Sequence, residues 1–136
     1  MNVANKRENI RAEIERGRES FRAAEVLMAQ SLYADAISRA YYAAFHAATA
    51  LLLTRGIEAK SHAGVLNRFS LLFIKPGLFD SSYGRVLSRA QKYREESDYS
   101  AAFVFTEHDA QQCITDVQRF LRAARAYLKK HRFMAK

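Results

Sequence analysis

The stretch "SRAYYAAFHAA", residues 38–48, sets two tyrosines, a phenylalanine and a histidine among alanines. Alanine favours helix, and its small side chain lets neighbouring helices approach closely. Extended in both directions, the stretch predicts a helix over about residues 33–54 that is apolar almost all round, with Gly56 as its C-terminal cap. Such a helix must be covered on most sides, either within a bundle or partly by a second subunit.

The other helices follow from apolar residues that recur at steps of three and four. The five expected helices span about residues 5–30, 33–54, 62–74, 81–97 and 106–130. Ser61 is the expected N-cap of the third helix, and Thr106 opens the fifth. Gly17, within the apolar stripe of the first helix, suggests close backbone approach by a neighbour. The sequence therefore predicts an all-α fold: an up-and-down antiparallel bundle of four main helices plus a short extra helix.

Composition predicts a single domain, residues 1–136, in the cytoplasm. The chain has one proline and five glycines, which argues against a disordered or strand-rich fold. A lone cysteine, Cys113, excludes a disulfide framework and favours a reducing compartment. No apolar run reaches transmembrane length and the N-terminus is not signal-like, so no membrane association is expected. The net charge of +8 suggests an anionic partner such as RNA, DNA, a nucleotide or an acidic protein.

A homodimer is expected from the face of the second helix that carries Ala43, Ala50 and Leu53. Exposed to solvent, these residues would form an apolar patch, which soluble monomers usually avoid. A two-fold symmetric contact would cover the patch and place Arg39 and His46 at or near the interface. In the alternative arrangement, other helices of the same chain wrap around the second helix and cover it.

The fourth helix offers the first candidate site residue, Arg94, on an otherwise apolar face. A guanidinium always carries its charge and cannot be buried alone. Asp98, four residues later, has the right spacing for an ion pair that ties the helix end to the bundle. The functional alternative is an arginine that lines a cleft and binds phosphate bidentately. The Tyr99 hydroxyl follows directly and suits either role.

The second and third helices contribute further candidate site residues. His46 is either a hydrogen-bonded core or interface histidine, or a ligand-binding or catalytic one. Tyr42 and His46 lie toward the face of this helix that carries Arg39. There they could meet Arg94 and Asp98 across a cleft. The remaining ligand-binding candidates are Arg39 and His62.

A basic strip follows the fifth helix beside its apolar stripe. It consists of Arg122, Arg125, Lys129 and Arg132. Such a strip is either a solvated face or a contact surface for nucleic acid. The sequence has no glycine-rich phosphate loop and no Cys/His cluster with zinc spacing, so we expect neither a cofactor nor a metal.

Three segments in this order resemble the HEPN superfamily, and within it the small UPF0332-like proteins with a tyrosine pair on the second helix. They are "SRAYYAAFHAA", "KSHAGVLNRF" (residues 60–69) and "YREESDY" (residues 93–99). The resemblance implies an up-and-down helical bundle that is commonly a homodimer. It also implies a frequent nucleotidyltransferase partner. Many members of the superfamily are metal-independent RNases of toxin–antitoxin or defence systems.

The RNase signature that the resemblance implies is an arginine, about four to six residues, then a histidine that acts as acid–base group. Arg94 stands at the arginine's position, but no histidine follows within reach. The spacing occurs elsewhere, where the family does not place it, as Arg39…His46, Arg55…His62 and Arg125…His131. We therefore expect a protein that binds a nucleotide, RNA or a nucleotidyltransferase partner without cleaving it. The alternative is an RNase that uses Arg94 with His46 or His62.

Overall fold

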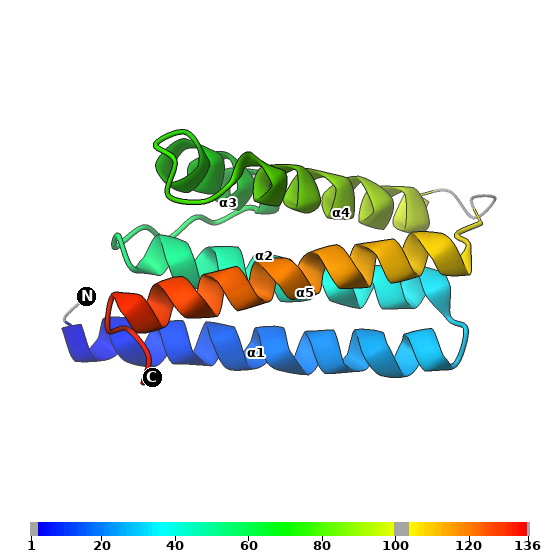
Figure 1. The fold of residues 1–136 in the computed structure, drawn as a ribbon, viewed down its shortest axis with the longest axis horizontal. Coiled ribbons are helices and arrows are strands. Elements are labelled where there is room, and N and C mark those ends of the chain that lie inside the picture. The colour runs from blue at the N-terminus through cyan, green and yellow to red at the C-terminus, as the bar shows by residue number, and fades with distance from the viewer. Residues whose placement is uncertain (1–2, 100–103, 136) are drawn as a thin grey trace.

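The computed structural model describes residues 3–99 and 104–135, and within them the side chains of all residues except 3, 4, 97 and 99. This part of the chain is helical and contains no strand. Its elements are α1 (Val3–Ala29), α2 (Tyr33–Leu53), α3 (His62–Phe69), the π-helical turn η1 (Ser70–Ile74), α4 (Ser81–Tyr99) and α5 (Glu107–Lys130) (Figure 1). None of these helices combines the length and hydrophobicity that a membrane crossing requires. The predicted all-α class is confirmed.

The ends of the helices lie where the local sequence predicts them. The Ser61 hydroxyl accepts a hydrogen bond from the Gly64 amide at 2.9 Å and so caps α3. At the start of α5, the side chains and amides of Thr106 and Asp109 bond reciprocally in a capping box. Gly56 ends α2 with φ of 71°, a left-handed conformation that glycine adopts without strain. One detail differs, because the predicted third helix changes to π-helical hydrogen bonding at Ser70–Ile74.

Helix α2 occupies the centre of the bundle and packs against α1, α3, α4 and α5. Twelve of its residues are buried, seven of them small alanines. Helix α1 approaches α2 closely at Gly17, where a Cβ atom would lie 3.3 Å from the Ala43 carbonyl oxygen. This contact confirms the close backbone approach that the glycine predicted.

The apolar face expected at a dimer interface is covered within one chain. Ala43 and Ala50 are fully buried, and Leu53 is 6% exposed. The premise of an exposed alanine stripe was therefore wrong, and the alternative arrangement holds, in which the other helices wrap around α2. The small side chains of this face serve the packing of α2 inside the bundle. A homodimer stays a prediction that the family resemblance alone supports.

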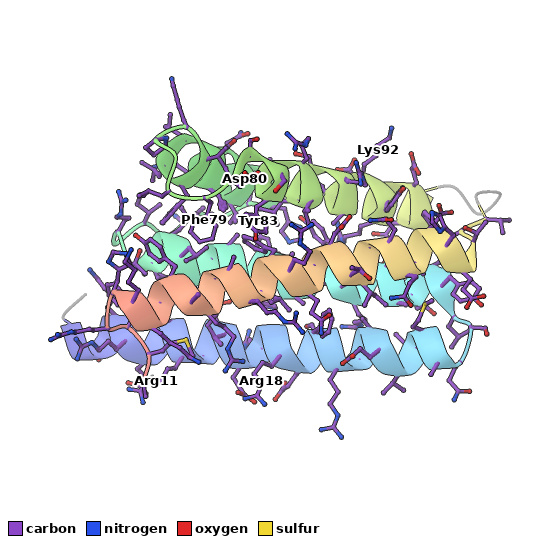
Figure 2. The ribbon with its side chains drawn as sticks, viewed as in Figure 1. Arg11, Arg18, Phe79, Asp80, Tyr83 and Lys92 are labelled. Atoms are coloured by element: carbon purple, nitrogen blue, oxygen red, sulfur yellow. The ribbon has the colours of Figure 1, made fainter. Side chains whose placement is uncertain are left out.

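An aromatic cluster fixes how α4 crosses the bundle. The Phe79 ring lies 5.8 Å from that of Phe73 and 6.3 Å from that of Phe120 on α5. Tyr83, on the first turn of α4, lies 5.8 Å from Phe120. Figure 2 shows Phe79 and Tyr83 between α4 and the rest of the bundle. The cluster secures the start of α4, so the far half of that helix, which carries Arg94, lies over the start of α2.

Candidate functional site

Arg94 is held against the tyrosine pair of α2. One of its terminal guanidinium nitrogens donates a hydrogen bond to the Tyr42 hydroxyl at 2.9 Å. Its central carbon lies 5.1 Å from the centre of the Tyr42 ring and 5.6 Å from that of Tyr41, within cation–π range. The nearest Asp98 oxygen is 3.7 Å away, too far for a hydrogen bond. Tyr42 therefore positions the guanidinium, while Asp98 balances part of its charge.

A pocket of about 400 Å³ opens beside Arg94, between the end of α4, the start of α2 and the end of α1. Arg39 reaches it from α2, with its guanidinium carbon 6.0 Å from the Tyr42 ring centre. The other lining residues are Leu27, Asp35, Ser38, Tyr42, Arg94 and Asp98. Two arginines and two aspartates thus face one pocket, and the Arg94 side chain keeps 24% of its surface exposed there.

Behind Arg94, the buried Tyr41 hydroxyl shares a hydrogen bond of 3.1 Å with Nδ1 of His62 at the start of α3. Burial raises the pKa of Tyr41 to about 12, so its hydroxyl stays protonated. The His62 ring lies 4.2 Å from the Phe45 ring and 6.0 Å from the Tyr42 ring. Burial, and then the positive charge of Arg94, lower the pKa of His62 below its usual value. A neutral imidazole therefore lies against the same tyrosine pair as Arg94.

His46 faces α1 instead of the pocket. Its Nδ1 atom lies 2.7 Å from a carboxylate oxygen of Glu13, and both side chains are mostly buried. A Cβ atom at Gly17 would approach the Cβ of His46 to 3.5 Å, so the pair lies beside the close approach of α1 to α2 at Gly17. This is the geometry of a hydrogen-bonded core histidine. Of the two α2 residues that were expected to contact Arg94, Tyr42 does so. The prediction for His46 was wrong, because His46 binds Glu13 of α1 instead.

The other candidates are dispersed. The Tyr99 side chain lies outside the described residues. Arg122 and Arg125 line a groove between α1 and α5, and Lys129 and Arg132 line a separate pocket at the end of the bundle where α1 begins. None of the four reaches the Arg94 pocket. Among the described residues, no three His, Cys, Asp or Glu side chains come together in a way that could hold a metal ion.

Several residues of the site had no place in the sequence prediction. Asp35 and Ser38 precede Tyr42 by seven and four residues, a helical spacing that could have placed all three on one face. The contacts of Tyr41 with His62 and of His46 with Glu13 join residues 21 and 33 positions apart. No local spacing signals such pairs.

Residues 10–127 match the model of the HEPN domain. The chain belongs to the HEPN domain family. This HEPN protein is 40% identical over 124 residues to "Putative toxin MJ0605" of Methanocaldococcus jannaschii, which covers 91% of this chain and 92% of that protein. It is 35% identical to "Putative toxin MJ0142" of the same organism, over 85% of this chain and 78% of that protein. A UPF0332 protein of Thermotoga maritima is 32% identical, over 79% and 82% of the two chains.

In this HEPN protein, the histidine that shares the surroundings of Arg94 comes from another helix. Among the residues that the structure describes, none of the three arginine–histidine spacings joins its own two side chains through a hydrogen bond or a ring contact. Arg55 lies over the Phe73 ring at 5.2 Å, and the His131 ring packs on Tyr127 at 4.2 Å. His62 instead joins Arg94 through the tyrosine pair that both contact.

The neutral state of His62 predicts a pH dependence of stability. Its folded-state pKa lies below the ordinary value of 6.5, so on acidification the unfolded chain binds a proton before the folded chain does. The free energy of unfolding is therefore fully retained above pH about 6.5 and falls as the pH drops toward the folded-state pKa. Urea unfolding from pH about 7 to 5 should show a steeper loss in the wild type than in a His62→Gln variant. Equal slopes would contradict a neutral, desolvated His62.

Proposed function

We propose that this HEPN protein binds the phosphate group of a nucleotide or of RNA in the pocket at Arg94. The observation that carries the proposal is the convergence of Arg39 and Arg94, from two helices, on the Tyr42 side of one pocket. Guanidinium groups bind phosphate through paired, charge-assisted hydrogen bonds. Arg94 is already held by Tyr42, so it loses less conformational freedom on binding than a free side chain would.

The two aspartates narrow the class of ligand. Asp35 and Asp98 accept hydrogen bonds and repel further negative charge. They suit the hydroxyl groups of a ribose or the amino group of a base, and they disfavour a polyphosphate chain. A nucleoside monophosphate, or one nucleotide within an RNA strand, matches two arginines, two aspartates and the Ser38 hydroxyl. The pocket volume of about 400 Å³ lies within the usual range for small-molecule sites.

Calorimetric titration with AMP, adenosine and ATP tests this function. AMP should bind, adenosine should bind much more weakly because it lacks the phosphate, and ATP should gain nothing from its extra charge. Equal binding of AMP and adenosine, or no binding of any nucleotide or RNA, would overturn the proposal.

A second candidate function, a metal-independent RNase, is favoured by the position of His62. Cleavage of RNA begins with removal of the 2′-hydroxyl proton, and a neutral histidine is the usual base. The resulting alkoxide attacks the adjacent phosphorus as the bond from phosphorus to the 5′-oxygen breaks. The leaving oxygen takes a proton from water, and the protonated histidine returns its proton to water. In this alternative, Arg94 stabilises the charge on the phosphate oxygens and His62 replaces the histidine that is missing after Arg94.

The RNase candidate predicts cleavage of RNA by the purified protein in the presence of a chelator. His62→Asn should lower the cleavage rate by about 100-fold or more, the usual effect of losing a general base. His108→Asn, at an exposed position at the start of α5, should leave the rate unchanged. If RNA stays intact with chelator present, the RNase candidate is rejected and the binding function stands alone.

The proposal extends to partners. Two relatives carry the name of a toxin, and the family resemblance implies a nucleotidyltransferase partner, so we assign this protein a toxin-like role in such a pair. The resemblance also implies a homodimer. Sedimentation at micromolar concentration should then give twice the chain mass of 15.5 kDa, and co-expression with a nucleotidyltransferase encoded beside it should yield a stable complex. A mass of one chain would remove the dimer from the proposal.

A further inference from the structure

Three residues that line the Arg94 pocket follow one face of α2. Asp35, Ser38 and Tyr42 stand at steps of three and four along the helix, a spacing that places their side chains on the same side. At 1.5 Å of rise per residue, the backbones of Asp35 and Tyr42 lie about 10 Å apart along the helix axis. The pocket therefore has a Tyr42 end, where the Arg94 guanidinium is held, and an Asp35 end.

The two aspartates of the pocket differ in their surroundings. An oxygen of Asp98 lies 3.7 Å from a terminal nitrogen of Arg94, so Asp98 belongs to the Tyr42 end. Asp35 is exposed, and within the part of the chain that the structure describes it takes part in no hydrogen bond and no ion pair. Both carboxylate oxygens of Asp35 are therefore free to accept hydrogen bonds from a ligand.

The separation of the two ends distinguishes the parts of a nucleotide that they contact. In a nucleoside monophosphate the ribose hydroxyl groups lie near the phosphate, whereas the hydrogen-bonding edge of the base is the part farthest from it. With the phosphate at Arg94, Asp98 stands beside the ribose and Asp35 stands at the base edge. Asp35 is therefore the acidic residue of the pocket that is placed to recognise the base.

The acceptors at the Asp35 end match guanine better than the other bases. A carboxylate accepts hydrogen bonds through two adjacent oxygens and donates none. Guanine offers two adjacent donors, N1–H and the N2 amino group, beside the O6 acceptor. Adenine and cytosine place one amino group beside a ring nitrogen whose lone pair repels a carboxylate, and uracil has its single N–H between two carbonyl groups. The Ser38 hydroxyl, about one helical turn from Asp35, is a donor suited to O6.

We propose that the Arg94 pocket selects guanine nucleotides and that Asp35 determines this specificity. The Asp35 carboxylate accepts hydrogen bonds from N1–H and from the N2 amino group of the base, and the Ser38 hydroxyl donates to O6. This inference rests on the proposed function, because the phosphate must bind at Arg94 to bring the base edge to Asp35.

Calorimetric titration of the full chain with GMP, IMP and AMP tests the base preference. GMP should bind about 10- to 100-fold more tightly than AMP, which lacks the pair of adjacent donors. IMP keeps N1–H and O6 but lacks the N2 amino group, so its affinity should lie between the other two. Equal affinities for GMP and AMP would overturn the proposal.

Asp35→Asn tests the residue itself, because an amide presents one acceptor beside one donor. That pattern complements the amino group and N1 of adenine, and it matches guanine less well. The ratio of GMP affinity to AMP affinity should therefore fall by about tenfold or more. Both nucleotides are compared in the same variant, so a change in its stability affects both alike. A ratio that stays at the wild-type value would refute the assignment of Asp35.

The matched control is Glu58→Gln, which makes the same chemical change at an exposed position between α2 and α3 and should leave the ratio unchanged. Two comparisons separate this inference from the proposed function. If GMP and AMP bind equally well and both lose affinity in Arg94→Ala, the pocket binds phosphate without selecting the base, and only the inference fails. If GMP binds no more tightly than guanosine, the phosphate is not bound at Arg94, and the proposed function fails together with the inference.

Discussion

Arg94→Ala is expected to lower the affinity for AMP by roughly 30- to 100-fold. The variant removes charge-assisted hydrogen bonds worth about 2–3 kcal/mol, and each 1.4 kcal/mol is about tenfold in affinity. Arg39 remains at the pocket and retains part of the attraction for the phosphate. Calorimetric titration of wild type and variant gives the ratio of dissociation constants directly.

Two further variants show whether the guanidinium itself is needed. Arg94→Lys keeps the charge but loses the planar fork, so its affinity should lie between those of wild type and Arg94→Ala. Arg85→Ala removes an exposed arginine from the same helix and should bind AMP like the wild type. Thermal unfolding should be followed in parallel, since Arg94 also packs on the tyrosine pair. Wild-type affinity in a folded Arg94→Ala protein would exclude the pocket as the phosphate site.

Ala43→Arg is expected to destabilise the fold by about 3 kcal/mol or more. Ala43 is fully buried, and a Cβ atom built at Gly17 of α1 would lie 3.3 Å from its carbonyl oxygen. An arginine side chain there has neither room nor a partner for its charge. Urea unfolding should show a transition at much lower concentration, or no folded baseline at all.

The matched control is Ala126→Arg, which places the same side chain on the exposed face of α5 and should change stability by less than about 0.5 kcal/mol. The two variants also distinguish whether the face with Ala43 and Ala50 is covered within one chain or by a second subunit. If Ala43→Arg gave a stable monomer from a dimeric wild type, the face would be an interface between subunits, and its burial within one chain would be contradicted.

The local features of the fold could be predicted because short-range chemistry determines them. Ser61, Gly56 and Thr106 end or begin helices through contacts a few residues apart, and all three do so as predicted. The stripe of Ala43 and Ala50 shows the limit of this reasoning. Sequence shows that a helix face is apolar, but a second subunit and the rest of the chain cover such a face equally well. Only the packing of the other helices around α2 decides between them.

The sequence allowed most residues of the site to be predicted, but it did not show which of them contact each other. Arg94, Tyr42 and Arg39 were each singled out by charge or position, and the structure brings them together at one pocket. His46 was assigned to the same cleft because it shares a face of α2 with Arg39, yet Glu13 of α1 binds it. The distance between α1 and α2 depends on Gly17, so this contact depends on tertiary packing.

The most direct test of the central claim is to observe the arginine side chains while ligand binds. Two-dimensional NMR of the guanidinium Nε–Hε groups, assigned through single arginine-to-lysine variants, can follow Arg39 and Arg94 during titration with AMP. We predict that these two signals shift together and saturate with the calorimetric dissociation constant, while those of Arg7, Arg11 and Arg132 do not shift. Shifts confined to Arg7, Arg11 and Arg132, with the Arg39 and Arg94 signals unchanged, would contradict the assignment of the pocket as the phosphate site.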